Sequence, residues 1–451
     1  MSTLMYVQKR KRLRRFGLLA LLALAGAAGI AAGDDPKPSL EVKGGKGTKT
    51  AEATAAPVPA DPIDAALASR GKLVGDAALR GALDLSKMEQ APGGGYFVPL
   101  PKGRRAILTL DPAIQEEAEK LLKRAKAPKS AIVVMKPDGT IVALAGRMQG
   151  PPIVESAPEL ATTVWAPAAS VFKLVTAHAL LAAGVGPDDP VRFHGGIRSV
   201  MKSNLEDDRR DNRADGSLSF AVAESNNAIM GKLAHRHLDQ AKMQKAARAF
   251  GLGTVPAWAI EAEPSRVAPP DGELEFAQFA AGFDGSFLSA VDGALLANTV
   301  ATGGMKVTPH IVAAIVDEKG SRKAVAPGPR TRAIPEANAR AIGKMMERTI
   351  ESGTGQRAFS GRRPGSPLHG IKIAGKTGSL SIDKPTYLGI SWFVAYAPAE
   401  KPEYAIAVVF GNAELWWLKA NLAARLLLER AMAVTSGGAQ QVTTAPAAAA
   451  K

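Results

Sequence analysis

The sequence predicts an α+β fold, in which strands from both ends of one large domain form an antiparallel sheet and a helical subdomain lies between them. Apolar runs at residues 131–135 and 141–145 flank the turn Pro137-Asp138-Gly139, which is typical of a strand hairpin. Strand-like alternation returns only in the last third of the chain, at 371–374, 390–395 and 404–410. Long helical patterns fill the interval, at 170–183, 218–237, 287–302 and 337–351, and two more helices are expected at 112–125 and 415–431. Because early and late strands enclose a helical middle, we expect the sheet to join both ends of the domain.

Composition excludes several kinds of chemistry. The chain has 451 residues, 46% of them hydrophobic, which is enough for one large core. Its net charge of +15 does not indicate nucleic-acid binding, because the cations outside the N-terminus are spread thinly and no basic stripe alternates with aromatic residues. Cysteine is absent, so thiol nucleophiles and thiolate metal sites are excluded. The six histidines show no metal-binding spacing, and we expect neither a metal nor a cofactor.

The N-terminus has the pattern of a membrane-targeting segment. Residues 1–15 are basic and precede an uninterrupted apolar run at 16–33, which ends at Asp34. Cations before the run and acids after it favour a cytoplasmic N-terminus, with the rest of the chain across the membrane. We expect an uncleaved single-pass anchor, although Ala25-Gly26-Ala27 leaves a cleaved signal peptide open. The remaining expected organisation is a disordered tether at 34–63, a small appended element at 64–104, the main domain at 105–433 and a disordered tail at 434–451.

One short motif, Ser170-Val171-Phe172-Lys173, combines a nucleophile with a base. Ser170 begins a strongly apolar helical pattern, and positions three apart share a helix face, so the amine of Lys173 is expected beside the hydroxyl of Ser170. Burial of Lys173 near other cations would lower its proton affinity and allow the neutral amine to accept the serine proton. Taken alone, the same residues also fit a helix cap and a solvated lysine.

Two further motifs follow in order, Ser225-Asn226-Asn227 and Lys376-Thr377-Gly378-Ser379. The first interrupts a helical pattern and also fits an ordinary loop between two helices. The second continues a strand-like run, where an extended peptide could add as a further strand. Residues 370–377 also match the phosphate-loop pattern G-x-x-x-x-G-K-[ST]. That pattern needs a helix directly after the lysine, and no helical pattern is present there.

Together the three motifs resemble those of the penicillin-binding protein transpeptidase domain, and the resemblance covers about residues 107–433. Further similar segments are 108–112, 133–137, 353–355 and 392–398. The resemblance implies the fold of penicillin-binding proteins and serine β-lactamases, with Ser170 acylated by D-Ala-D-Ala stem peptides and by β-lactams. It implies that Lys173, Ser225 and Lys376 act with Ser170 in catalysis. Asn227, Thr377, Gly378 and Ser379 would bind substrate, and the backbone N–H groups of Ser170 and Ser379 would form the oxyanion hole.

The family also implies where the protein works and with what. We expect a peptidoglycan DD-transpeptidase on the bacterial cytoplasmic membrane, with its catalytic domain outside the cytoplasm. Its expected partners are stem peptides, β-lactams, the membrane through the N-terminal anchor, and a lipid-linked glycan polymerase. Ala169 and Ser379 depart from the usual family residues, and residues 34–104 leave no room for a large pedestal or a glycosyltransferase. A DD-carboxypeptidase or endopeptidase, or a catalytically silent penicillin-binding scaffold, therefore remain alternatives.

Overall fold

The central sheet brings the two ends of the main domain together, as the sequence predicts. The computed structural model describes residues 61–443 apart from 151–152, 197, 209–212, 363 and 385, and side chains only to residue 436. The expected basic segment, membrane anchor, most of the tether and the last residues of the tail lie outside the described residues. Among the described residues, no helix combines the length and apolar character that crossing a bilayer requires.

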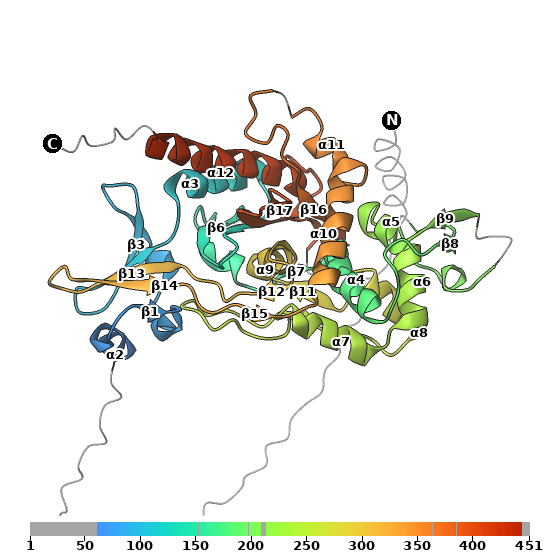
Figure 1. Ribbon diagram of the computed structural model, residues 1–451, viewed down its shortest axis with the longest axis horizontal. Coiled ribbons are helices and arrows are strands. Elements are labelled where there is room, and N and C mark those ends of the chain that lie inside the picture. Colours follow the sequence, from blue (N-terminus) through green and yellow to red (C-terminus); the bar gives the residue numbers. More distant parts are fainter. Residues whose placement is uncertain are drawn as a thin grey trace, which may run out of the picture. The chain divides into compact units, whose positions relative to one another are not determined.

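Five antiparallel strands form this sheet in the order β16-β17-β18-β5-β6. Figure 1 labels β6, β16 and β17 among them. Their bounds are β5 (Lys129–Met135), β6 (Ile141–Met148), β16 (Ala374–Ile382), β17 (Leu388–Ala397) and β18 (Tyr404–Asn412). Pairing of β18 with β5 joins the late strands to the early hairpin, with Val408 opposite Ile132. The sheet therefore ends at β16, whose outer edge is free of any strand among the described residues.

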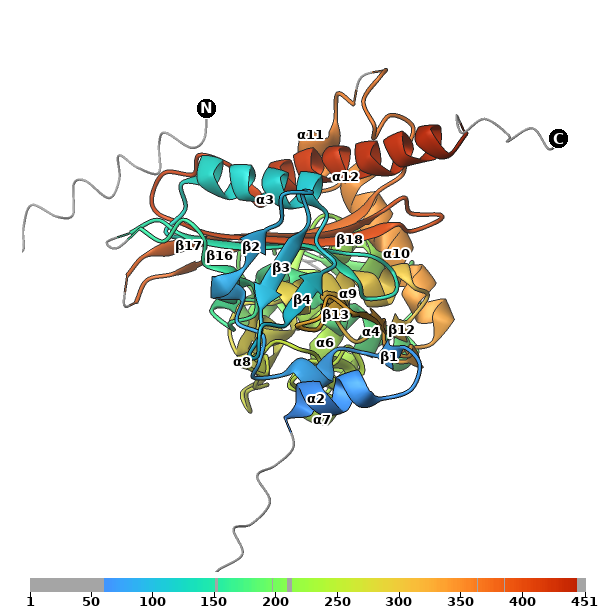
Figure 2. The same cartoon turned by 90° about the vertical axis from the view of Figure 1, so that its left-hand side faces the viewer.

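Helices cover both faces of the central sheet. Figure 2 shows α3 (Pro112–Ala125) and α12 (Ala420–Thr443) together on one face, with α9 (Ala290–Ala301) on the other. Neighbouring strand residues alternate between the two sides, so Trp392 packs in the core with α9 while Phe393 packs in the core with α3 and α12. Both faces of β5, β6, β17 and β18 are buried, and these four strands are mostly apolar, whereas the edge strand β16 is polar and partly exposed.

The helical subdomain lies on the α9 side of the sheet. The helical pattern at 218–237 is not one long helix, and the alternative of a loop between two helices at Ser225-Asn226-Asn227 is confirmed. That segment forms two helices, α5 (Leu218–Ala223) and α6 (Asn227–His237), separated by a turn with Ser225 in the left-handed region at φ 55°. The N–H of Asn226 donates to the carbonyl oxygen of Ala221 at the end of α5, and its side chain caps α6 by accepting a hydrogen bond from the N–H of Ile229. The other helices are η5 (Ala169–Phe172), α4 (Lys173–Ala182), α7 (Gln240–Ala249), α8 (Glu273–Ala280), α10 (Glu336–Glu351) and α11 (Gln356–Phe359).

The segment expected as a separate appended element shares a second sheet with the main domain. This sheet has the order β1-β14-β13-β4-β3-β2, so strands from both sides of residue 104 pair with one another. Its members are β1 (Leu73–Val74), β2 (Glu89–Gln90), β3 (Tyr96–Pro99), β4 (Arg105–Leu108), β13 (Val312–Val316) and β14 (Arg322–Ala326). The helix α2 (Pro62–Ala68) precedes β1. Two 3-10 turns, η2 (Ala77–Leu79) and η3 (Leu85–Lys87), lie between β1 and β2. Buried Arg104 also donates to Asp61 and Asp64 beside and within α2.

Three predicted boundaries differ from the structure for local reasons. The strand expected at 371–374 begins only at Ala374, because its partner β17 ends at Ala397 and Pro398 has no N–H. The helix expected from residue 287 begins at Ala290, since Ser289 caps it with Asp292 in a capping box, and residues 286–288 form strand β11. The last helix begins at Ala420 instead of 415 and continues to Thr443, well past the expected start of the tail.

Short elements complete the fold around the subdomain. Three small strand groups are β7 (Ala166–Pro167) with β10 (Arg266–Val267) and β11 (Ser286–Leu288), β8 (Val191–Phe193) with β9 (Ala214–Gly216), and β12 (Met305–Lys306) with β15 (Thr331–Arg332). The remaining 3-10 turns are η4 (Pro158–Ala161) and η6 (Lys202–Asn204). Strand β7, in the first of these groups, leads directly into the segment that carries Ser170.

Candidate active site

Ser170 lies at the point where extended chain turns into a buried helix. The indole of Trp392 on β17 donates to the carbonyl of Pro167 at 2.9 Å, which fixes the approach to the turn. Ala169 then adopts a left-handed conformation with φ 48°, which costs a residue with a side chain about 1 to 2 kcal/mol. Gly282 packs against this turn so closely that a Cβ there would lie 2.1 Å from the carbonyl oxygen of Ala169. The backbone around Ser170 is thus held from both sides.

This strain makes a prediction for Ala169. Ala169→Gly should stabilise the protein by about 0.5 to 1 kcal/mol, because glycine adopts the left-handed conformation freely although its unfolded state is more flexible. Thermal unfolding checks this, with Ala168→Gly as the matched control. Ala168 is right-handed at φ −61° and ψ −23°, so its glycine variant should lose about 0.5 to 1 kcal/mol. A lower melting temperature for both variants would contradict the prediction.

Lys173 lies one turn after Ser170 and is completely buried. Its Nζ donates at 2.8 Å to the Oγ of Ser170, at 2.7 Å to the Oδ1 of Asn227 and at 2.5 Å to the carbonyl oxygen of Ala281. The α4 helix thus presents the amine to the hydroxyl, and the start of α6 and the end of α8 hold the amine in place. The structure therefore brings together the first motif and Asn227 of the second.

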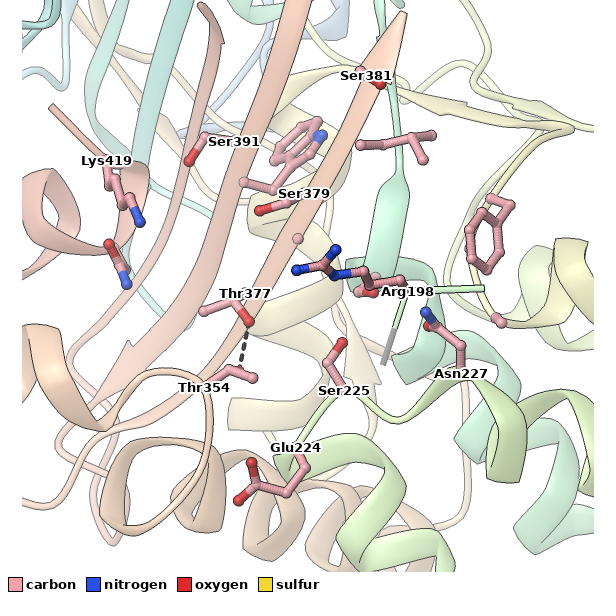
Figure 3. Close-up of a pocket in the computed structure, with 18 of the residues that line it drawn as sticks. Arg198, Glu224, Ser225, Asn227, Thr354, Thr377, Ser379, Ser381, Ser391 and Lys419 are labelled. Atoms are coloured by element: carbon pink, nitrogen blue, oxygen red, sulfur yellow. Dashed lines mark hydrogen bonds between the residues drawn. The ribbon is translucent and has the colours of Figure 1, made fainter. Parts of the chain in front are cut away.

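The other half of the site joins the second and third motifs. Lys376 on β16 is completely buried and donates at 3.0 Å both to the Oγ of Ser225 and to the carbonyl oxygen of Thr377. Ser225 adopts a left-handed conformation between α5 and α6, and its hydroxyl contacts this lysine. Thr377 shares a hydrogen bond of 2.6 Å with Thr354, which follows the end of α10 (Figure 3). All eight residues that the sequence singled out lie within this one arrangement.

Burial of two lysines changes their protonation. Burial, and then the positive charge of Lys376, hold the pKa of Lys173 well below its usual value near 10.5. Burial also lowers the pKa of Lys376 to about 7, although the carboxylate of Glu224 acts in the opposite direction. Two ammonium groups this close repel each other, so one amine is expected to be neutral and available as a proton acceptor.

A cavity of about 520 Å³ opens over these residues and includes several that sequence reasoning missed. It is lined by Ser170, Ser225, Asn227, Thr377, Gly378 and Ser379 of the motifs, and also by Arg198, Glu224, Thr354, Trp416 and Lys419. Figure 3 shows Arg198 above Ser225 and Glu224 below it, on the helical side of β16. Glu224 directly precedes the second motif and Thr354 lies within the segment 353–355 noted in the sequence, whereas no pattern indicated Arg198 or Lys419.

The phosphate-loop interpretation of residues 370–377 does not fit the structure. Lys376 and Thr377 lie within β16, which continues as a strand to Ile382, so no helix N-terminus follows the lysine. The buried amine of Lys376 instead points at Ser225.

Comparison with known proteins indicates the same family as the motifs. The family described as the penicillin binding protein transpeptidase domain matches residues 130–426. The chain is 24% identical over 344 residues to the peptidoglycan D,D-transpeptidase PbpA of Mycobacterium tuberculosis, covering 69% of this chain and 68% of that protein. It is 25% identical over 336 residues to the penicillin-binding protein PbpB of Mycolicibacterium smegmatis, covering 68% of this chain and 50% of that protein.

Solved structures share the fold. The ceftriaxone acyl-enzyme complex of penicillin-binding protein A from M. tuberculosis matches with a TM-score of 0.60 and 21% identity, over 74% of this chain and 80% of that one. The D,D-transpeptidase domain of a peptidoglycan glycosyltransferase from Eggerthella lenta matches with a TM-score of 0.62 and 24% identity, over 79% of this chain and 92% of that one.

Proposed function

Because this chain belongs to the penicillin-binding protein transpeptidase family, we propose that it is a peptidoglycan DD-transpeptidase that is acylated at Ser170 by D-Ala-D-Ala stem peptides and by β-lactams. One observation carries the proposal: the hydroxyl of Ser170 lies 2.8 Å from the fully buried amine of Lys173. A lowered pKa leaves that amine able to take the serine proton, which is how a weak nucleophile is activated.

Acylation follows from this pair. Lys173 takes the proton of Ser170 as the oxygen bonds to the carbonyl carbon of the penultimate D-Ala, or of the β-lactam ring. The backbone N–H groups of Ser170 and Ser379 stabilise the oxyanion. The carbon–nitrogen bond then breaks, and the proton that Lys173 took from Ser170 passes to the leaving nitrogen through the hydroxyl of Ser225, which Lys376 holds in place. The product is an ester on Ser170 and free D-Ala, or an opened β-lactam that stays attached.

Substrate binding uses the strand edge. A peptide extended along β16 places its terminal carboxylate at Lys376 and Thr377, where the lysine supplies charge and the threonine a hydroxyl. Gly378 has no side chain, and a Cβ there would lie 3.0 Å from Trp392 and 3.4 Å from Ala169, so it permits a close approach of strand and helix. Asn227 binds an amide of the peptide while its Oδ1 holds Lys173.

Product analysis tests the proposed reaction. The purified protein is incubated with an acetylated peptide ending in D-Ala-D-Ala, with and without an acceptor amine, and the products are identified by mass. A transpeptidase forms the cross-linked amide when the acceptor is present. Release of D-Ala with hydrolysis alone would instead support the DD-carboxypeptidase alternative, and no turnover together with no penicillin adduct would support the silent scaffold.

The two lysines make a prediction about pH. Lys376 must be protonated to bind a carboxylate, and its pKa is about 7, so this charge is present below pH 7 and is lost above it. Lys173 must be neutral, so its contribution is lost as the pH falls through its own lowered pKa. We therefore expect the second-order rate of acylation by penicillin to fall by about tenfold per unit well above pH 7.

Lys376→Arg checks which group causes the alkaline decline, because arginine keeps its charge throughout this range. Its rate at pH 6 is expected to be lower, since guanidinium does not fit the lysine site, but the decline above pH 7 should disappear. Lys372→Arg, at an exposed lysine four residues away, is the matched control and should keep the wild-type profile. An unchanged decline in Lys376→Arg would assign it to another group.

We also propose that residues 16–33 anchor the protein in the bacterial cytoplasmic membrane, with the catalytic domain outside. The apolar run and the basic residues before it support this. A protein lacking residues 1–33 should leave the membrane fraction while keeping its penicillin adduct. A lipid-linked glycan polymerase is the proposed partner, because cross-linking requires newly made strands, and chemical cross-linking in membranes is the test.

A further inference from the structure

A second cavity, of about 230 Å³, lies apart from the catalytic cleft, and no residue that the proposed reaction uses lines it. Its walls come from the end of α9, from one side of α10 and from the turn between β17 and β18. The two helices contact each other over this part of the sheet (Figure 2). We call this space the α10 cavity.

A buried hydroxyl without a partner faces the α10 cavity. Tyr396, near the end of β17, is only 4% exposed and lines the cavity. Its hydroxyl makes no hydrogen bond with any described residue. Burial, and then the charge of Glu347, raise the pKa of Tyr396, so the hydroxyl keeps its proton at neutral pH. A buried polar group of this kind requires a partner from a ligand or from water.

Helix α10 leaves space for such a partner. Gly343 lies in the middle of this helix, where a Cβ would come within 2.5 Å of the hydroxyl oxygen of Tyr396. Glycine is unfavourable in a helix interior, but any other residue here would displace the hydroxyl. Glu347 lies one turn further along α10, so its side chain is on the same face as Gly343 and also lines the cavity.

Burial determines the sign of the charge in the α10 cavity. Glu347 is 9% exposed, and both of its carboxylate oxygens lie 2.9 Å from the amine of Lys344. The side chains of Lys344 and Arg340 are 66% and 72% exposed, so the positive charges lie at the rim. A carboxylate has lone pairs for further donors, and the buried charge of the cavity is therefore negative.

The remaining walls favour an organic cation. Helix α9 ends at Ala301, which lines the cavity, so the negative end of this helix dipole adds to the charge of Glu347. Val300, Ala339 and Ala399 supply an apolar surface. The described residues contain no group of three or more metal-ligating side chains, as a hard metal ion would need. An ammonium group on a short apolar stem matches both parts of the lining.

We propose that the α10 cavity binds an alkylammonium ion. Its N–H groups donate to the carboxylate of Glu347 and to the hydroxyl oxygen of Tyr396, and its stem packs between Val300, Ala339 and Ala399. Hydrogen bonds from a cation to a buried carboxylate are among the strong ones. The site does not depend on acyl transfer at Ser170, because the two cavities share no lining residue.

Calorimetry with three small molecules of equal length tests the proposal. Butylammonium, butanol and butyrate are each titrated into the purified protein at constant ionic strength. Butylammonium should bind with a dissociation constant of about 1 mM or below, which is within the ceiling for so small a ligand. Butanol and butyrate should bind at least about tenfold more weakly, since neither is a cation. Absence of saturable butylammonium binding, or equal binding of butyrate, would overturn the proposal.

Variants then place the ion in the α10 cavity. Glu347→Gln should weaken butylammonium binding by at least about tenfold, and Tyr396→Phe by about three- to tenfold. Glu351→Gln is the matched control, because Glu351 is an exposed carboxylate one turn further along α10 and does not line the cavity. It changes the net charge equally and should leave the affinity within about twofold of wild type. Equal losses in Glu347→Gln and Glu351→Gln would contradict the assignment.

Lys344→Met tests the sign of the site. It removes the cation that pairs with Glu347, so butylammonium should bind about two- to fivefold more tightly. Weaker binding in this variant would mean that the cavity selects an anion. Nα-acetyl-lysine amide distinguishes the source of the ammonium group: binding equal to that of butylammonium identifies a lysine side chain, and binding of butylammonium alone identifies a free amine. Both results support the shared chemistry.

Discussion

Ser170→Ala is expected to abolish the covalent penicillin adduct completely. The Oγ of Ser170 is the atom that lies 2.8 Å from the buried amine of Lys173, and alanine leaves nothing there to form an ester. The loss should not come from misfolding, because Ser170 is only half-buried and a hydroxyl is removed without creating a large cavity. Intact-mass measurement after penicillin treatment gives the result directly, and peptide mapping locates the adduct in the wild-type protein.

A second hydroxyl makes this a strict test. The Oγ of Ser225 lies 3.0 Å from Lys376, so a lysine also adjoins this serine. Ser225→Ala should slow the formation of the adduct without abolishing it, since the proposed role of Ser225 is proton transfer. Ser321→Ala, at an exposed turn far along the β13–β14 hairpin, should react like the wild type. An adduct that persists in Ser170→Ala and disappears in Ser225→Ala would reverse the assignment.

Lys173→Met should lower the acylation rate by roughly a thousandfold, within the range that a positioned general base contributes. Methionine has nearly the same length and fills the buried space, so the protein should remain folded. It accepts no proton, however, and leaves Ser170 as an unassisted alcohol. The second-order rate of penicillin acylation measures the effect, and thermal unfolding confirms that the variant is folded.

Lys173→Arg separates a base from a structural cation. Arginine keeps a positive charge and donors toward Asn227 and Ala281, but its pKa is too high for it to give up a proton at neutral pH. If Lys173 acts as a base, this variant should be as slow as Lys173→Met. Recovery of most of the acylation rate by arginine would show that the site needs only a charge there.

The sequence predicts the sheet and the main helices well where a local pattern determines the structure. The runs of β5, β6, β17 and β18 are continuous and apolar because both faces of their sheet are covered. The S-x-x-K spacing likewise places Ser170 beside Lys173 through helix geometry alone. These features depend on residues close together in the chain, which a single sequence contains.

Features that depend on distant contacts were not predictable in this way. The two amides at 226 and 227 indicate a break in the helical pattern, but not that Ser225 adopts a left-handed conformation, which places the serine beside Lys376. Residues 415–419 continue an apolar helical pattern, yet Ala420 begins the helix because Ser391 on β17 caps it. Trp416 and Lys419 therefore lie in a loop that lines the cavity, and no motif indicates their role.

The pairing of β18 with β5 also determines when the cleft can exist. Ser170 and Lys173 belong to the first half of the chain, whereas Lys376 stands on a strand held in place through β17 and β18. The sheet closes only when segments more than about two hundred residues apart meet, and contacts of such long range form slowly during folding. Ser170 and Lys376 can therefore come together only once this long-range pairing has formed, so we expect penicillin labelling at Ser170 to require that the last quarter of the polypeptide has folded.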